Sequence, residues 1–569
     1  MKPVTTTILQ PAFLILASIL GYGAENGTSP PTSDPASQAR GVGEFSVRAF
    51  GAAGDGRTLD TAAVQAAIDA CCQNSGGTVR VPPGNYLVGT IRLKSNVTLE
   101  LAATAVLLGS KDLAQYATNI ARCGFVNENA IDKCLLYAEH AERVAVVGRG
   151  TVDGQGAAFP VRRPDGKPGE RPMLLRFFQC TNVLVEGVTL RNAGAWCSHY
   201  RECDGVRVHG VTIHNRANGN GDGIDLMSTR NVRISDCTLL CQDDAICLQN
   251  MSDERPTENI VINNCIISTR WAALRTGGAH RGGIRHVAMS NCFIYDTFGC
   301  GIKLQVSGNG SLEDMTFTGI VMKNVTSPIS LRFGNCHYNN EKRDERFPFG
   351  AMRNLLLSNI RATVIDEQSL KERIWEPPVV TEKARHHPGE ERQCISICGI
   401  PGHPIEGITL SDIHVTFPGG GTKADAAKGE MPELEDQYPE YFMWGVLPAY
   451  GLYARHATGL TLNNVRFDLA GKDLRPALVC DDVEDIEIAG LKAAGDATAE
   501  SLLRLRDTRD AFIHTSRPLG PIATFLQVEG AKSARISLAG NKLDQARKAI
   551  VKSNGAGSVD VTMQPDGAQ

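Results

Sequence analysis

The 569-residue sequence has little net charge, and this absence excludes several classes of partner. Its 58 lysines and arginines nearly balance 62 acidic residues, which gives a formal net charge of −4 and an isoelectric point near 6.4. Such a balance indicates neither nucleic acid nor an anionic membrane surface as a partner. Hydrophobic residues make up 42% of the chain and charged residues 21%, as is typical of a globular protein.

A long apolar run is also missing. The N-terminal apolar segment, Ile8 to Leu20, is too short and too interrupted to predict a membrane span. Because Lys2 precedes it and small residues follow it, we predict a signal peptide at residues 1–24. A polar linker rich in Pro and Ser follows at residues 25–43. We therefore expect a secreted or periplasmic protein without membrane attachment after cleavage; a cytosolic protein with an apolar start is the alternative.

The 17 cysteines lack the spacing of a metal site or of a disulfide-rich scaffold. Cys237, Cys265 and Cys292 instead follow short apolar segments at steps of 28 and 27 residues. A fixed place in a repeat favours buried, stacked thiols. We expect no cofactor, and the sequence decides neither disulfide pairing nor oligomeric state.

A short pattern with an apolar centre recurs through the middle of the chain. Asp222-Gly-Ile-Asp-Leu226 is followed after 22 residues by Asp244-Ala-Ile-Cys-Leu248. Three further copies follow at steps of 28, 28 and 27 residues: Ala272-Ala-Leu-Arg-Thr276, Cys300-Gly-Ile-Lys-Leu304 and Ser327-Pro-Ile-Ser-Leu331. A repeat of this length predicts a coil that stacks on itself.

Alternating segments of about five residues, such as Asn182 to Glu186 and Asn259 to Asn263, predict short strands along most of the chain. Most begin with Asn, Gly or Asp, which tolerate the left-handed conformations of turns. Coils of roughly 22 to 30 residues with two or three such strands predict an all-β fold, a right-handed parallel β-helix. A β-propeller would need four strands in repeats of about 40 residues, so these repeats are too short for it.

We expect residues 44–569 to form one β-helix domain. The Ala-rich segment Ala62 to Ala70 predicts a helix that caps the first coil. Polar insertions interrupt the repeat at about 338–350, 366–392 and 417–450. The third insertion ends in the aromatic segment Pro439-Glu-Tyr-Phe-Met-Trp444, which we interpret as a wall beside a groove, with a plain surface loop as the alternative.

Alignment of the copies on their central Ile or Leu predicts which residues lie above one another. The apolar centres should face the core, so the residue after each centre should face outward. This outward column consists of Asp225, Cys247, Arg275, Lys303 and Ser330. It predicts the floor of a substrate groove, or alternatively a solvated ladder of ion pairs.

Two aspartates, Asp222 and Asp244, precede the centres of their copies by two residues. Strict alternation would turn them into the core, where a pair of carboxylates is costly. We therefore expect the strands to begin after them, at Gly223 and Ala245. Both aspartates, together with Asp243, would then project from turns into the groove.

Several motifs resemble those of family 28 glycoside hydrolases, the polygalacturonase and rhamnogalacturonase-like family of the pectin-lyase-type β-helix superfamily. Phe45 to Asp55 and Gly76 to Tyr86 resemble the opening coil of such enzymes. Asn220-Gly-Asp222 resembles the family's Asn-Thr-Asp motif, and Gln242-Asp-Asp244 resembles its Gly-Asp-Asp motif. The resemblance covers most of residues 44–490.

The resemblance implies a glycosidase that hydrolyses a pectin-like or other acidic polysaccharide or oligosaccharide. By this resemblance Asp243 is the general acid, and Asp222 and Asp244 activate the attacking water. That scheme is an inverting mechanism without a metal, in which the acid and the base lie about 6.5–9.5 Å apart. Long loops beside the groove would favour exo action.

Two family motifs are altered, which leaves the sugar open. The Gly-His-Gly element falls near Trp271 to Ala273 and has no His, and Arg-Ile-Lys appears as Gly301-Ile-Lys303. The residues that we expect to bind substrate are Asn220, Asp225, Arg275, Lys303, His280, Tyr453 and Arg455.

Two other functions fit the same fold. A polysaccharide lyase or uronan epimerase would use Arg275 or Lys303 as its base and the aspartates for Ca²⁺. A non-catalytic carbohydrate-binding β-helix would keep its function when Asp243 is replaced by Asn.

Overall fold

The computed structural model describes residues 43–123, 129–335, 348–372, 387 and 389–563. These residues belong to one compact unit, Val42–Gln569. The predicted signal peptide, nearly all of the linker, and much of the insertions at 338–350 and 366–392 lie outside the described residues. Within the described ranges, no helix has the length and apolar character needed to span a membrane.

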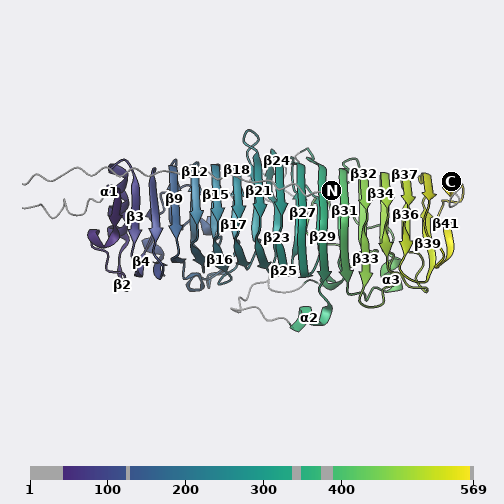
Figure 1. The fold of residues 1–569 in the computed structure, drawn as a ribbon, viewed down its shortest axis with the longest axis horizontal. Helices are drawn as coiled ribbons and strands as arrows, with labels where there is room; N and C mark the ends of the chain where they lie inside the picture. The colour runs from purple at the N-terminus through teal and green to yellow at the C-terminus, as the bar shows by residue number, and fades with distance from the viewer. Residues whose placement is uncertain (1–42, 124–128, 336–347, 373–386, 388, 564–569) are drawn as a thin grey trace, which may run out of the picture. The chain divides into compact units, whose positions relative to one another are not determined.

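The chain winds through successive coils, and each coil adds strands to three parallel ladders, so that side-by-side strands in Figure 1, such as β12, β15 and β18, belong to successive coils. Every pair of named strands in the described part of the chain is parallel. Asn182, Asn231 and Asn259 lie second or third in their strands with φ of 55°, 59° and 59°, the left-handed conformation that Asn tolerates. The predicted parallel β-helix is therefore confirmed.

The first ladder carries the repeated pattern and its aspartates. Its strands are β5 (Ile91–Arg92), β8 (Cys134–Glu139), β11 (Met173–Phe178), β14 (Ser198–Arg201), β17 (Ile224–Met227), β20 (Ile246–Met251), β23 (Ala272–Arg281), β26 (Cys300–Val306), β28 (Ile329–Phe333), β30 (Ile395–Cys398), β32 (Leu452–Asn463), β34 (Leu478–Ala489), β36 (Leu503–Arg506), β39 (Ile522–Glu529) and β41 (Ala546–Ser553).

The strands of the second ladder contain alternating segments that the sequence predicted, and some of these strands continue into a neighbouring ladder. Its strands are β1 (Glu44–Ser46), β3 (Gly77–Val81), β6 (Val97–Leu101), β9 (Glu142–Gly148), β12 (Thr181–Glu186), β15 (Asp204–His209), β18 (Arg230–Ser235), β21 (Thr257–Asn263), β24 (Gly283–Ser290), β27 (Ser311–Val325), β29 (Ala351–Val364), β31 (Ile405–Phe417), the later halves of β32 and β34, β37 (Arg509–His514), β40 (Ala534–Ala539) and β42 (Val561–Met563).

The third ladder completes the coil. Its strands are β2 (Asp55–Leu59), β4 (Gly84–Val88), β7 (Ala105–Gly109), β10 (Thr151–Asp153), β13 (Thr189–Arg191), β16 (Thr212–Asn215), β19 (Thr238–Cys241), β22 (Ile266–Thr269), β25 (Phe293–Thr297), the later halves of β27, β29 and β31, β33 (Arg466–Leu469), β35 (Lys492–Ala493) and β38 (Arg517–Pro518).

The predicted capping helix is present as α1 (Thr61–Gln73), which contacts β1, β3, β5 and β6. Its buried residues Val64, Ala67, Ile68 and Cys71 cover the apolar end of the first coils, which would otherwise face water. The other helices are short: α2 (Glu367–Glu372), α3 (Lys423–Ala426), and the 3₁₀ turns η1 (Val47–Phe50), η2 (Leu113–Gln115), η3 (Asn129–Ile131), η4 (Gly156–Ala158) and η6 (Glu390–Arg392).

The core runs through the middle of the coils. One continuous cluster of buried apolar side chains includes the centres of the repeated pattern. Cys237, Cys265 and Cys292 are at most 3% exposed, as the repeat predicts, and no disulfide joins two of the described cysteines.

Candidate functional site

The strand register confirms the alignment of the repeated pattern. Ile224 pairs with Ile246, Ile246 with Leu274, and Leu274 with Ile302. The residues of the outward column therefore lie above one another on β17, β20, β23, β26 and β28.

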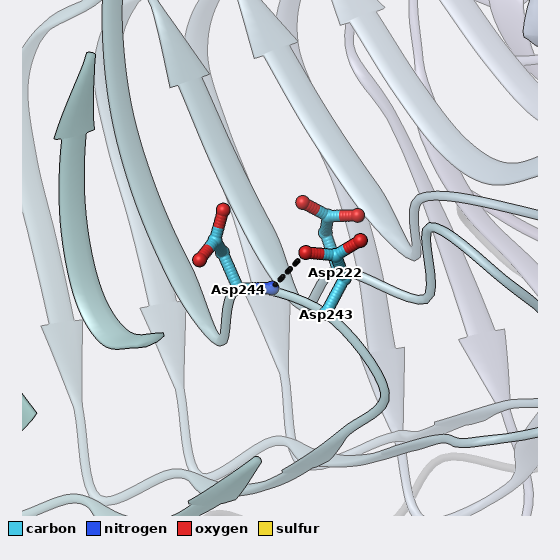
Figure 2. Close-up of side chains that lie close together, drawn as sticks. All are labelled: Asp222, Asp243 and Asp244. Carbon is cyan, nitrogen blue, oxygen red and sulfur yellow. Dashed lines mark hydrogen bonds between the residues drawn. The ribbon is translucent and has the colours of Figure 1, made fainter. Parts of the chain in front are cut away.

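Three aspartates meet beside the outward column. Asp222 lies in the turn before β17, and Asp243 and Asp244 lie in the turn before β20, as the argument from burial cost predicts. Figure 2 shows their side chains on one side of the chain, with the backbone N–H of Asp244 donating to Oδ1 of Asp243 at 3.2 Å. One carboxylate oxygen from each residue lies within 4.8 Å of the other two.

A glycine lets the two aspartate turns approach one another. A Cβ atom on Gly223 would lie 2.4 Å from the carbonyl oxygen of Ala245 on the next coil. No side chain tolerates that contact, so the glycine after Asp222 brings its turn against the turn of Asp243 and Asp244.

The position of Asp244 is fixed by the next coil. The backbone N–H of Ala272 donates to Oδ1 at 3.1 Å, and Arg275 Nη1 donates to Oδ2 at 2.5 Å. Burial disfavours the charged guanidinium, but Asp244 and the neighbouring Cys247 and Glu440 raise the pKa of Arg275 above its ordinary value. Arg275 is thus a permanent cation, and Asp244 is its partner.

One expectation about this cluster is wrong. The aspartates were expected to project into an open groove, but Asp222, Asp243 and Asp244 are only 4%, 1% and 0% exposed.

The outward column is likewise not a solvated ladder. Asp225, Cys247, Lys303 and Ser330 are buried, and the side chain of Arg275 is only 12% exposed. Asp225 is 0% exposed, and neither of its oxygens has a hydrogen-bond partner among the described residues. Burial, followed by the charges of Asp244 and Asp243, raises the pKa of Asp225 well above its ordinary value. The column thus contains a carboxyl group that favours its neutral form.

Residues 438–444, which we call the covering segment, lie over the other end of the column. Its Glu440 accepts from Lys303 Nζ at 3.0 Å, and Lys303 is fully buried. The ring of Tyr438 lies 5.3 Å from the guanidinium carbon of Arg275. The insertion predicted to form a wall therefore contacts the column directly.

Residues of three coils hold the covering segment in place. Arg332 donates to the backbone carbonyl of Glu440 at 2.8 Å, and Gln305 donates to that of Pro439. The hydroxyl of Tyr441 bonds Phe298 O at 2.8 Å and also contacts Glu390 Oε1. These bonds fix the backbone on both sides of Glu440.

The remaining predicted binding residues are less closely grouped. Asn220 precedes Asp222, and its Oδ1 accepts from Arg171 at 2.9 Å. Tyr453 is buried in line with Lys303 but three strands farther along, or about 14 Å. Arg455 pairs with Glu433 and bonds Met431 O. His280 lies on β23 opposite Asn250, and its side chain lies outside the described residues.

Sequence reasoning missed Glu440, Trp271 and Arg332. Trp271 stands where a family His was sought, and Lys303 Nζ lies 4.9 Å from its ring centroid. Neither Glu440 nor Arg332 occupies a position of the repeated pattern that pointed to the site. The one available indication was that Glu440 is the only acidic residue within the aromatic segment Pro439 to Trp444.

In the described part of the chain, the three aspartates are also the group of side chains whose spacing could hold a metal ion. Both oxygens of Asp244, however, already accept hydrogen bonds from Ala272 and Arg275. A cation would have to displace a buried guanidinium, so the donor set fits acid/base chemistry better than Ca²⁺.

Comparison with known proteins identifies related sequences and a structure with the same fold. The sequence profile described as glycosyl hydrolases family 28 matches residues 71–372. A probable polygalacturonase of Vitis vinifera is 28% identical over 386 residues, or 64% of this chain and 73% of that protein. An exo-poly-alpha-D-galacturonosidase of Dickeya chrysanthemi is 26% identical over 335 residues, or 49% of this chain and 55% of that protein. An exopolygalacturonase structure from Thermotoga maritima shares the fold, with 22% identity and a TM-score of 0.55 over 75% of this chain and 91% of that one.

Proposed function

Because the chain belongs to family 28 of the glycosyl hydrolases, we propose that it hydrolyses glycosidic bonds of a pectin-like or other acidic polysaccharide or oligosaccharide, with Asp222, Asp243 and Asp244 as catalytic residues. The observation that carries this proposal is the meeting of three carboxylates whose oxygens lie within 4.8 Å of one another. The relatives named as polygalacturonases support the pectin-like substrate.

The three aspartates divide two tasks in the proposed reaction. Asp243 donates its proton to the glycosidic oxygen as the bond to the anomeric carbon breaks. A water molecule attacks that carbon and gives its proton to Asp222 or Asp244. Arg275 keeps Asp244 as the acceptor, since its guanidinium holds Oδ2 of that carboxylate.

We propose inversion at the anomeric carbon, as the family resemblance implies. NMR of the first product tests this proposal, because an α-linked substrate gives a β product by inversion and an α product by retention.

Exo action and export complete the proposal. The covering segment lies across Arg275 and Lys303, which supports a site closed at one end and cleavage from a chain terminus. The N-terminal apolar segment of the sequence supports a secreted or periplasmic location.

A screen of defined pectic oligosaccharides tests the function. We expect Asp243→Asn to lose roughly 10²–10⁴-fold in kcat, the usual share of a general acid. The matched control is Asp253→Asn, the same change at an exposed aspartate, and it should keep wild-type activity. Unchanged activity in Asp243→Asn would reject the acid, and products with an absorbing unsaturated end would identify a lyase instead.

A further inference from the structure

We propose that Glu440 determines the substrate specificity of this site by forming an ion pair with Lys303. Because the ammonium is already paired, the sugar bound beside Lys303 must carry an uncharged group instead of a carboxylate. The inference rests on the proposed hydrolase function and narrows its substrate. The ligand class is a pectin-like chain whose residue at this position is neutral or esterified.

The first step is the environment of Lys303. Its side chain is 0% exposed, its ammonium lies 3.0 Å from Glu440 Oε2, and the ring centroid of Trp271 lies 4.9 Å away. A buried ammonium needs a counter-charge, and here the protein itself supplies it. A sugar carboxylate could reach the same ammonium only by displacing Glu440.

The second step is that Glu440 cannot easily move away. Arg332 holds its backbone carbonyl at 2.8 Å, and the guanidinium carbon of Arg332 lies 3.9 Å from the ring centroid of Trp444. Gln305 and Tyr441 hold the residues before and after it. Displacement of the carboxylate would therefore break several buried contacts or leave it buried without Lys303.

The third step is the charge of the surroundings. The neighbouring cation of the column, Arg275, is already paired with Asp244. An incoming carboxylate would meet Glu440 and the aspartate cluster, with both column cations occupied. Like charges brought together in a buried site are strongly unfavourable, and such repulsion is an effective way to reject a ligand. A hydroxyl, by contrast, can donate to Glu440.

A matched pair of substrates tests the inference: a pectic oligosaccharide whose residue beside Lys303 carries a free carboxylate, and the same oligosaccharide with only that carboxylate methyl-esterified. We expect the wild type to have a kcat/KM about tenfold or more in favour of the esterified form. Glu440→Gln should shift this ratio about tenfold towards the acidic form, because Lys303 is released. Glu430→Gln removes the same charge from an exposed position of the same insertion and should leave the ratio unchanged.

A double variant identifies Lys303 as the group that Glu440 controls. Lys303→Gln added to Glu440→Gln should return the ratio towards the wild-type value, since no cation remains for the carboxylate. If the single variant Glu440→Gln and the double variant showed the same shift of the kcat/KM ratio towards the acidic form, the role of Lys303 would be overturned. If Glu440→Gln does not fold, Glu440→Asp replaces it: its shorter side chain should move the ratio in the same direction by a smaller factor, and no movement would refute the inference.

Binding by calorimetry in the Asp243→Asn background separates the inference from the hydrolase function. A wild type that binds both oligosaccharides and cleaves neither would overturn the proposed hydrolysis. Cleavage by the wild type, with a binding ratio that Glu440→Gln does not shift, would overturn the specificity role of Glu440 alone.

Discussion

Two neighbouring cations of the outward column are neutralised from different parts of the molecule. Arg275 pairs with Asp244, 31 residues earlier on the adjoining coil, whereas Lys303 pairs with Glu440, 137 residues later in an insertion. The first pair is a product of the repeat, and the second depends on a segment outside it. The repeat thus builds the reacting centre, and the insertion modifies its charge.

Both pairs are largely shielded from solvent, so water does little to solvate either cation. Lys303 is 0% exposed and the side chain of Arg275 is 12% exposed. Taking a charge out of water costs several kcal/mol, which a partner must offset. Each cation therefore depends on its partner for stability, and Lys303, the more deeply buried of the two, should depend on it more.

The largest effect on stability is expected when the pair from the insertion is broken. Glu440→Gln leaves the Lys303 ammonium buried without its carboxylate, and loss of about 3–5 kcal/mol is typical of such a change. Urea unfolding measures the loss, and Glu430→Gln is the control. Lys303→Gln in the same chain should restore most of the stability, and a double variant as unstable as the single one would contradict the argument.

Breaking the pair from the repeat should reduce turnover more than breaking the pair from the insertion. Arg275→Gln removes the guanidinium from Asp244 Oδ2, so the proposed base loses its fixed position. We expect a fall in kcat on the order of 100-fold, against less than about tenfold for Lys303→Gln, because the partner of Lys303 is Glu440 and not a proposed catalytic aspartate. Steady-state kinetics on the best substrate gives both values, and equal losses in kcat would remove the distinction.

The same contrast explains what could be predicted from sequence. The steps of 22, 28, 28 and 27 residues placed Asp225, Cys247, Arg275, Lys303 and Ser330 in one column, and the pairing register agrees. The period of the coil fixes which residues stack, so spacing suffices there. Burial of this column could not be predicted, because the covering segment has no period and reaches Lys303 across 137 residues.

Alkaline pH should weaken the anchor of the covering segment. Burial raises the pKa of Glu390 from 4.5 to about 8, although the hydrogen bond from Tyr441 opposes this. Between these values the folded protein holds a proton that the unfolded chain has released, so this residue makes stability fall as pH rises from 4.5 to 8.

Glu390→Gln tests that dependence, since an amide oxygen can still accept from Tyr441. We expect the variant to gain on the order of 2 kcal/mol relative to wild type between pH 5 and pH 8, measured by thermal or urea unfolding. Glu430→Gln, at an exposed site, should follow the wild-type curve. A constant difference between Glu390→Gln and wild type across this range would show that Glu390 does not carry the effect.

The smallest effect is expected where the repeat continues away from the aspartates. Tyr453 lies in line with Lys303 but about 14 Å along the stack, and its hydroxyl makes a long 3.5 Å bond to Asp481. Tyr453→Phe keeps the buried ring and removes only that bond, so we expect less than about 1 kcal/mol in stability and less than about twofold in kcat/KM. A rise in KM of tenfold or more would instead extend substrate contacts along the column to Tyr453.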